Sequence, residues 1–345
     1  MEMVAYIKEA RAPGFKRVIK PVPEAIGDDE ALIKVLATSI CGTDVHIYKW
    51  DQWSQNRIKP PVTVGHELSG RVIKVGSKVT QVKVGDVVSA ETHIVCHHCE
   101  FCARGEYHLC ENTKIIGVDT DGCFAEYVKL PACNLIVNNT KTDPKYLSIQ
   151  EPLGNAVHTM MQFPIAGKTV AILGCGPIGL MGLDIAKALG AKKVIAVEVN
   201  QYRIDAAMKL GADAVINPKN EDVIKRVLEE TDHEGVDVVA EFSGSKTAIE
   251  AAFKYLKRGG KMSMLGIGDG NLQIDFSNDI VFKGISIYGV VGRLMFKTWD
   301  QIQTLIASGK LHLDQIVTHV YRLDQMEEAM ATMISGNSGK VVLIP

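Results

Sequence analysis

The hydrophobic pattern of the chain changes near residue 165. Before this point, short β-branched runs are cut by glycines, as in ALIKVLATSI, SGRVIKVGSKV and GDVVSA. Such runs are typical of strands joined by long loops. After this point, apolar runs alternate with segments in which hydrophobic residues recur at helical spacing. The first part therefore predicts a β-rich domain, and the second predicts alternating strands and helices.

The alternation starts with a predicted buried strand, KTVAILGCG, and a predicted amphipathic helix, IGLMGLDIAKALG. It continues with KVIAVEV, QYRIDAAMKLG, DAVIN, EDVIKRVLEE, VDVVAEFSG, KTAIEAAFKYLKRGG, KMSMLGIG and ISIYGVV. Apolar strands that alternate with helices in this way form a parallel sheet covered on both faces. We therefore expect an α/β chain with a doubly wound parallel sheet. The tail, KTWDQIQTLIASGK and LDQMEEAMATMISGNSGKVVLIP, predicts helices followed by a final strand.

Composition narrows the class of protein. The chain has 345 residues, of which 46% are hydrophobic and 23% charged, so two globular domains are expected. A formal net charge of -2 argues against nucleic acid or an anionic membrane surface as the main partner. The N-terminus has no apolar core of signal-peptide length, and no run reaches the roughly 20 apolar residues of a membrane span. We expect a soluble cytoplasmic protein.

A glycine-rich turn in GCGPIG places Gly174, Gly176 and Gly179 in the pattern G-x-G-x-x-G. The turn follows a predicted strand and opens a predicted helix, as a dinucleotide-binding turn must. The first glycine makes the bend, the second lets the backbone approach a pyrophosphate, and the third lets helix and strand pack closely. We therefore expect this turn, which includes Ile178, to bind a dinucleotide cofactor.

Glu198 stands at the end of the next predicted strand. A carboxylate there can hydrogen-bond the ribose hydroxyls and would repel a 2′-phosphate, which favours NAD over NADP. Arg203 complicates this reading, because an arginine can hold a 2′-phosphate. The carboxylate has the expected position, so we expect NAD.

Four cysteines lie close together in CHHCEFCARGEYHLC: Cys96, Cys99, Cys102 and Cys110. Stable disulfides are rare in a reducing compartment, where such a cluster more often binds a metal. Four thiolates complete the tetrahedron that zinc prefers and leave no position for a substrate. An iron–sulfur cluster also uses four cysteines, but the ferredoxin run has a shorter last gap and a following proline. We expect a structural zinc lobe at about residues 92–113, with the histidines of this loop outside the ligand set.

Other metal-binding residue types are dispersed in CGTDVH, GHE and EPLGNAVHT. A catalytic zinc has about three protein ligands and one open position. Cys41 and His66 would supply a thiolate and an imidazole, and Glu67 or Glu151 a carboxylate. An isolated Cys or His is more often a core residue, so the spacing alone does not assign these residues.

These motifs resemble the zinc-containing medium-chain alcohol dehydrogenases over essentially the whole chain. The likeness rests on GHE followed by SGRVIKVGSKV, on GDVV, on the four-cysteine lobe and on the glycine-rich turn. It implies a GroES-like catalytic domain built from residues 1–150 and 291–345. It also implies that a Rossmann NAD-binding domain at residues 151–290 is inserted between them.

The resemblance further implies two zinc ions per chain, one structural and one catalytic. It assigns Cys41, His66 and Glu67 to the catalytic ion, with Glu151 as a ligand or close neighbour. The substrate hydroxyl would occupy the open position of that ion.

In a dehydrogenase of this kind, Thr43 would take the hydroxyl proton and His46 would pass it toward solvent through the cofactor ribose. A turn-capping hydroxyl and a packed ring are the plain structural alternatives for these two residues. His93, just before the zinc lobe, would contact the substrate or serve as a loop residue. The family's nicotinamide-side positions match Leu265, Gly266, Ile267, Val290 and Val291.

Within the family, four segments are most similar to the branch that oxidises L-threonine: CGTDVHIYKWDQWSQNRIKPPVTVGHE, GCFAEY, EPLGNAVHT and MFKTW. This implies oxidation of the secondary hydroxyl to 2-amino-3-oxobutanoate, which a partner CoA ligase can take up. Relatives in this family are commonly homotetramers. The alternative is a zinc polyol dehydrogenase acting on sorbitol or 2,3-butanediol. A zinc ribbon that binds nucleic acid would need a basic face, which the net charge does not favour.

Overall fold

The protein divides into two compact units in a computed structural model that describes residues 1–268 and 270–345. One unit contains Met1–Glu151 and Val317–Pro345, and the other contains Pro152–Ile316. In the described part of the chain, no helix is both long and apolar enough to cross a bilayer.

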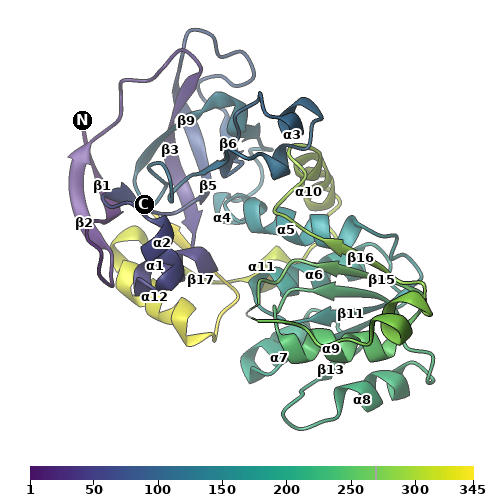
Figure 1. Cartoon of the computed structure of the whole chain (residues 1–345). Coiled ribbons are helices and arrows are strands. Elements are labelled where there is room, and N and C mark those ends of the chain that lie inside the picture. The colour runs from purple at the N-terminus through teal and green to yellow at the C-terminus, as the bar shows by residue number, and fades with distance from the viewer. Residues whose placement is uncertain (269) are drawn as a thin grey trace. The chain divides into compact units, whose positions relative to one another are not determined.

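The first unit is built mainly of strands, and its secondary structure comes from both ends of the chain (Figure 1). Its strands are β1 (Glu2–Lys8), β2 (Lys16–Pro21), β3 (Glu30–Ser39), β4 (Val62–Thr63), β5 (Glu67–Val75), β6 (Val87–Ala90), β7 (His93–Ile94), β8 (Lys114–Ile115), β9 (Tyr127–Pro131), β10 (Leu135–Val137), β17 (Val317–Arg322) and β18 (Lys340–Ile344). Its α-helices are α1 (Gly42–Lys49), α2 (Gln52–Arg57), α3 (Glu100–Ala103), α4 (Pro144–Leu147) and α12 (Met326–Ser335). Short 3₁₀ turns lie at Tyr107–Leu109, Ala132–Asn134 and Leu323–Gln325.

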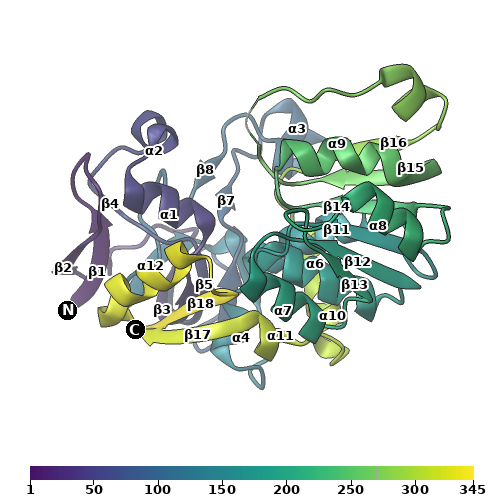
Figure 2. The ribbon, with the colours of Figure 1, turned by 90° about the horizontal axis from the view of Figure 1, so that it is seen from below.

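The largest sheet of this unit has the order β10-β6-β5-β3-β18-β17, and β9 also pairs with β3. Strand β18 runs antiparallel to β3, with Val342 opposite Ser39, so the end of the chain completes the sheet. Helices α1 and α12 lie side by side (Figure 2). They enclose a core with Ile47 and Met330 among its buried residues. This is the GroES-like domain that the resemblance implied.

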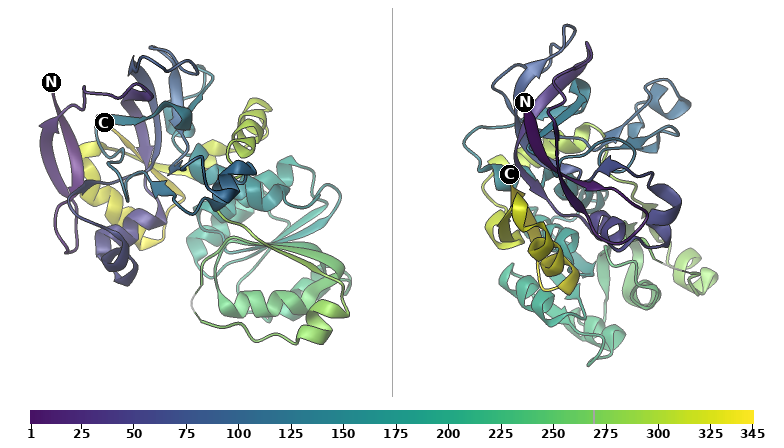
Figure 3. Two further views of the ribbon diagram at one scale, coloured as in Figure 1. Left: turned by 45° about the horizontal axis from the view of Figure 1, so that its top comes forward. Right: turned by 90° about the vertical axis from the view of Figure 1, so that its left-hand side faces the viewer.

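The second unit contains a six-stranded parallel sheet in the order β13-β12-β11-β14-β15-β16, with helices on both faces (Figure 3). Its strands are β11 (Thr169–Leu173), β12 (Lys193–Val197), β13 (Ala214–Ile216), β14 (Val236–Glu241), β15 (Leu256–Met264) and β16 (Ser286–Gly289). Its helices are α6 (Pro177–Ala188), α7 (Gln201–Lys209), α8 (Val223–Glu230), α9 (Lys246–Tyr255), α10 (Lys297–Ala307), α11 (Leu313–Ile316) and a π-helical turn at Phe276–Val281, while α5 (Gln150–Met161) begins in the first unit. The doubly wound parallel fold predicted from the alternation is confirmed.

The helix predicted to run through KTAIEAAFKYLKRGG is shorter than expected. It ends at Tyr255, and Leu256 already has an extended backbone. Leu256 pairs with Val236, the register then shifts, and Lys261 pairs with Val238. Gly259 has a φ of +69°, a conformation that does not continue a helix. The run KRGG therefore forms an irregular part of β15.

The second unit also reaches further along the chain than residue 290, where the resemblance placed the return to the first domain. Helix α11 packs against α6. The backbone N–H of His312 donates to Asp184 Oδ2 at 2.7 Å, and His312 Nδ1 lies 2.8 Å from Asp184 Oδ1. These contacts hold residues up to Ile316 against the Rossmann helices.

A buried ion pair joins the last strand to the middle of the large sheet. Lys340, at the start of β18, is 2% exposed, and Glu67, at the start of β5, is fully buried. Lys340 Nζ lies 2.5 Å from Glu67 Oε2 and donates to the carbonyl of Ile40 at 2.8 Å. The hydroxyl of Ser39 donates to the same carboxylate oxygen. The two separate segments that make up the first unit are therefore joined by a buried charged contact.

Replacing Lys340 with methionine should lower the free energy of unfolding by about 3–5 kcal/mol, because Glu67 would stay buried without its cation. Urea denaturation followed by tryptophan fluorescence measures this loss. The matched control is Lys16→Met, which removes an exposed ion pair with Glu9 and should leave the free energy nearly unchanged. Equal losses for the two variants would contradict a structural role for the buried pair.

Candidate functional site

The four-cysteine lobe lies between β7 and β8. The sulfur atoms of Cys96, Cys99, Cys102 and Cys110 all lie within 4.8 Å of one another. Cys99 is the N-cap of α3, Cys102 lies inside this short helix, and Cys110 follows the turn at Tyr107–Leu109. The fold therefore brings together the four thiols that the spacing predicted. Four sulfurs this close fit the closed tetrahedral coordination of zinc.

The pKa values of two thiols in this lobe are shifted in opposite directions. The N–H groups of His98 and Cys99 lower the pKa of Cys96 to about 5. Burial and the neighbouring thiols raise the pKa of Cys102 to about 12. A metal ion that binds here must displace the remaining thiol protons, so its binding is coupled to proton release.

The histidines of the loop have other partners. His98 Nδ1 lies 2.6 Å from the carbonyl oxygen of Cys96, and the ring of His97 packs edge-on against Tyr107 at 5.9 Å. His108 does not belong to the group of clustered donor atoms found among the described residues. The set at this lobe is therefore made of sulfur alone.

A second group contains Cys41, His66 and Glu67, whose donor atoms also lie within 4.8 Å of one another. Cys41 is the N-cap of α1, and Glu67 is the first residue of β5. His66 follows Gly65, which has a φ of +86° and faces the ring of Phe124 so closely that a Cβ would lie 2.3 Å from it. The sharp bend at Gly65 turns His66 and Glu67 toward the start of α1.

The donors of this second group fit a divalent cation. His66 Nδ1 and Glu67 Oε1 are buried atoms that have no hydrogen-bond partner among the described residues. Buried polar atoms are normally satisfied, so unpaired polar atoms beside a thiol favour a metal ligand set. One sulfur, one nitrogen and one oxygen would leave a position open, unlike the four sulfurs of the lobe.

Asp44 is a site residue that the sequence analysis missed. It is fully buried, its Oδ2 accepts from the N–H of Cys41 at 2.8 Å, and its Oδ1 lies 3.8 Å from His66 Nδ1. Burial raises the pKa of Asp44 to about 6. Burial also opposes the charge of His66, but Asp44 and Cys41 raise the pKa of His66 to about 10. Asp44 therefore holds the backbone of Cys41 by a hydrogen bond and acts on His66 through its charge. The sequence signal that could have identified Asp44 is its position three residues after Cys41, at the start of the same helix.

Thr43 and His46 lie on α1 beyond Cys41. Thr43 Oγ1 is 3.8 Å from Cys41 Sγ. His46 is largely exposed, and its Nδ1 forms a short hydrogen bond with Asp51. Asp51 also accepts from the N–H of Ser54 at 3.0 Å and so caps α2. The hydroxyl thus lies near the buried donors and the imidazole lies toward solvent.

Glu151, in the first turn of α5, contributes to the raised pKa of His66. It does not belong to the set of donor atoms within 4.8 Å formed by Cys41, His66 and Glu67. The structure therefore brings Glu151 near this group as a charged neighbour.

The glycine-rich turn connects β11 to α6. Gly174 has a φ of +83°, and a Cβ on Gly179 would lie 1.9 Å from the carbonyl oxygen of Gly174. Gly176 is the N-cap of α6, and a Cβ there would meet only Arg203 Nη1, at 3.8 Å. The turn is therefore tight, closely packed beneath the helix and open at its middle glycine, which is the geometry that a pyrophosphate requires.

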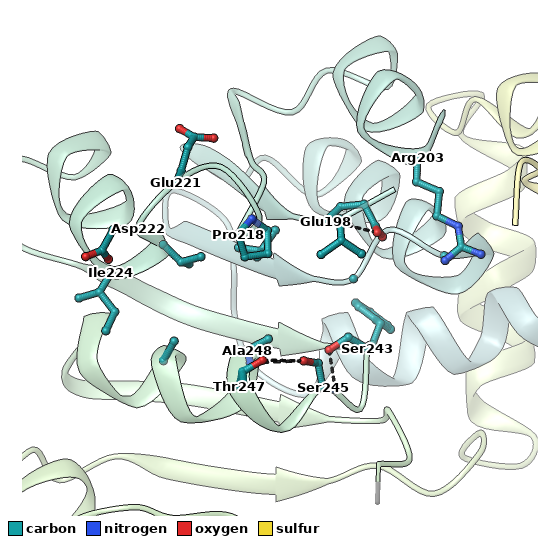
Figure 4. A pocket seen from close by; sticks show the side chains of 17 residues that line it. Glu198, Arg203, Pro218, Glu221, Asp222, Ile224, Ser243, Ser245, Thr247 and Ala248 are labelled. Carbon is teal, nitrogen blue, oxygen red and sulfur yellow. Dashed lines mark hydrogen bonds between the residues drawn. The ribbon is translucent and has the colours of Figure 1, made fainter. Parts of the chain in front are cut away.

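A cavity of about 720 Å³ lies beside this turn (Figure 4). Glu198 and Arg203 line one side of it, and Ser243, Ser245 and Thr247 line the other. Glu198 Oε2 accepts from the N–H of Cys175 at 2.7 Å, while Oε1 accepts from the N–H groups of Val199 and Asn200 at 2.7 and 2.9 Å. The backbone thus holds the carboxylate at the rim of the cavity. The three hydroxyl residues were not singled out by the sequence analysis, although the predicted strand VDVVAEFSG ends beside them.

The expected nicotinamide-side residues lie elsewhere in the same unit. Leu265, Gly266 and Ile267 follow β15, and Val290 and Val291 follow β16, its neighbour in the sheet. Ile178 lies in the first turn of α6. None of these six lines the cavity beside the glycine-rich turn. The five residues that follow β15 and β16 form a second group at the carboxyl ends of adjacent strands.

Comparisons with known proteins agree with the description of each of the two units. The family of alcohol dehydrogenase GroES-like domains matches residues 27–139, and the zinc-binding dehydrogenase family matches residues 177–308. The chain is 51% identical to an L-threonine 3-dehydrogenase from Caldanaerobacter subterraneus subsp. tengcongensis, over 99% of both chains. It is 49% identical to an L-threonine 3-dehydrogenase from Bacillus subtilis, over 100% of this chain and 99% of that protein.

Solved structures are similar over the full length. One is described as a zinc-binding dehydrogenase from Sinorhizobium meliloti 1021 bound to NADP, with a TM-score of 0.92, 30% identity and complete coverage of both chains. Another is 2R,3R-butanediol dehydrogenase from Bacillus subtilis, with a TM-score of 0.88, 29% identity and 99% coverage of both chains. The chain belongs to the zinc-containing medium-chain alcohol dehydrogenase family.

Proposed function

We propose that this protein oxidises the secondary hydroxyl of L-threonine to 2-amino-3-oxobutanoate, with NAD as the hydride acceptor. The observation that carries the proposal is identity of about one residue in two, along the whole chain, with proteins named L-threonine 3-dehydrogenase. The site supports a zinc-dependent alcohol oxidation of this kind, because it combines a closed donor set with an open one.

Two zinc ions per chain are part of the proposal. Cys96, Cys99, Cys102 and Cys110 would hold a structural ion. Cys41, His66 and Glu67 would hold the catalytic ion, with Glu151 as a charged neighbour. A zinc ion bound there polarises an alcohol hydroxyl and makes its proton easier to remove.

The residues of α1 would carry the proton away. Thr43, beside Cys41, would accept the hydroxyl proton. His46 would pass it to solvent, and Asp51 would hold the imidazole in place through Nδ1, so that Nε2 is the nitrogen that exchanges the proton. This arrangement supports a relay that leads from the buried donors to the exposed end of the helix.

The second unit would bind the cofactor. The turn with Gly174, Gly176 and Gly179 would hold the pyrophosphate, and Glu198 would receive the adenosine ribose hydroxyls. The loops at 265–267 and 290–291 would contact the nicotinamide, the group that accepts the hydride. We propose NAD as the preferred cofactor because Glu198, held by three backbone N–H groups, would repel a 2′-phosphate.

Association into a homotetramer is a further part of the proposal. Strand β16 is an edge strand of its sheet, and Ile287 in it and Phe282 before it are 43% and 67% exposed. An apolar sheet edge of this kind favours pairing with another copy. The unstable product, a β-keto acid, also favours functional coupling to a 2-amino-3-oxobutanoate CoA ligase.

A polyol dehydrogenase is the second candidate, favoured by the likeness to 2R,3R-butanediol dehydrogenase. An NADH-formation assay separates the two. L-threonine should give a kcat/KM at least about 100-fold higher than sorbitol or 2,3-butanediol. A higher value with either polyol would reverse the assignment.

The two groups of proposed zinc ligands should respond differently to substitution of a cysteine. Cys41→Ser should abolish turnover and release about one zinc per chain while the fold survives, because it alters the open donor set. Cys102→Ser should lower the thermal midpoint by roughly 5 °C or more, because the closed set holds the lobe together. Cys133, an exposed cysteine outside both groups, gives the control Cys133→Ser, which should change neither. Metal analysis and calorimetry check these results, and the opposite pattern would mean that the two roles are reversed.

Substitution of Glu198 should relax cofactor choice. In Glu198→Ala the ratio of kcat/KM for NAD to that for NADP should fall about tenfold or more, because the variant no longer repels a 2′-phosphate. Glu229→Ala, on the partly exposed surface of α8, should keep the wild-type ratio. An unchanged ratio in Glu198→Ala would show that the ribose contact lies elsewhere.

A further inference from the structure

Glu241 is a fully buried carboxylate at the end of β14 that the proposed mechanism does not use. Its Oε1 accepts from the N–H and the hydroxyl of Ser243, both at 2.6 Å, and from the N–H of Gly244 at 2.8 Å. Its Oε2 lies 3.2 Å from the N–H of Gly266. Glu241 therefore binds donors from two loops, the one after β14 and the one after β15.

The two loops touch backbone to backbone at three glycines. A Cβ on Gly244 would lie 2.4 Å from the carbonyl oxygen of Ile267, and a Cβ on Gly268 would lie 2.1 Å from the carbonyl oxygen of Gly244. A Cβ on Gly266 would lie 2.2 Å from Gly244 N and 2.5 Å from Glu241 Oε2. Contacts this close leave no room for side chains, so the spacing of the loops is set by the glycines and by the carboxylate beneath them.

Glu241 ends a strand that lies beside the point in the sheet where a dinucleotide cofactor would bind. Strand β14 lies next to β11, where the strand order reverses, and dinucleotides bind across such a switch point. The glycine-rich turn and Glu198 belong to the β11–β13 half, and the cavity beside them is closed on its other side by residues that follow β14. The nicotinamide half of the cofactor would then contact the loops that follow β14, β15 and β16. Ser243, which donates to Glu241, also lines the cavity.

We propose that Glu241 is a positioning residue for the nicotinamide half of the cofactor. Its carboxylate holds the loops at 243–244 and 265–267 at the separation that lets their backbone approach the nicotinamide ribose and ring. Hydrogen bonds from N–H groups to a carboxylate are stronger than those between neutral groups, so this buried side chain strengthens the hold on both loops. The N–H groups of Leu265 and Gly266 also donate to the backbone carbonyl of Glu241, at 3.0 and 3.2 Å. This inference rests on the proposed use of a nicotinamide cofactor.

The test compares whole-cofactor binding with adenosine-half binding in Glu241→Gln. The amide keeps the shape of the side chain but presents an NH₂ group to backbone N–H donors, which loses at least one hydrogen bond. The dissociation constant for NADH, measured by fluorescence titration, should rise about tenfold. The dissociation constant for 5′-AMP should stay within about twofold of wild type. Glu229→Gln, in the partly exposed face of α8, is the matched control and should change neither.

A second variant keeps the test independent of whether Glu241→Gln folds. Gly268→Ala leaves the carboxylate intact but pushes its loop from the carbonyl of Gly244, so it should weaken NADH binding and spare 5′-AMP. Parallel losses for both ligands, or no loss for either, would overturn the positioning role. A wild-type protein that binds 5′-AMP but not NADH would overturn the proposed cofactor instead, which separates the two failures.

Discussion

The ion pair between Lys340 and Glu67 is the contact on which the first unit depends. Two buried charges must satisfy each other, since either one alone would be strongly destabilising. Lys340 and Ser39 engage one oxygen of Glu67 and leave Oε1 beside Cys41 and His66. Lys340, on the last strand of the chain, therefore helps to orient the Glu67 carboxylate within the open donor set.

The sequence predicted the second unit better than the first. Strands β11, β12 and β14 are mostly apolar because a parallel sheet is covered on both faces, and this leaves a pattern that is visible in the sequence. Helix α1 has no comparable pattern, because one of its buried residues is the carboxylate Asp44. The end of α9 was also missed, since its stop depends on the pairing of Leu256 with Val236 rather than on local propensity.

In the candidate site, residues that are close in the sequence were also easier to predict than residues that only the fold brings together. The four thiols of the lobe lie within one short segment, so their spacing alone predicted that they would converge. Cys41 and His66 meet only through the fold, and a family resemblance was needed to predict their meeting. Lys340 and Glu241 gave no signal in advance, because a buried charge is recognisable only from its partners. Residues that act through non-local hydrogen bonds were thus the part that sequence reasoning could not reach.

Helix α1 has the Cys41 thiol, one of the proposed metal ligands, at its N-cap and an exposed imidazole near its other end. At about 1.5 Å of rise per residue, Cys41 and His46 are separated by about 7.5 Å along the axis. The thiol and the imidazole are thus little more than one helical turn apart. One residue added within that turn would rotate the imidazole by about 100° and leave the thiol where it is. In the proposed relay, the length of this short helix sets the distance between the thiol and the imidazole that passes the proton to solvent.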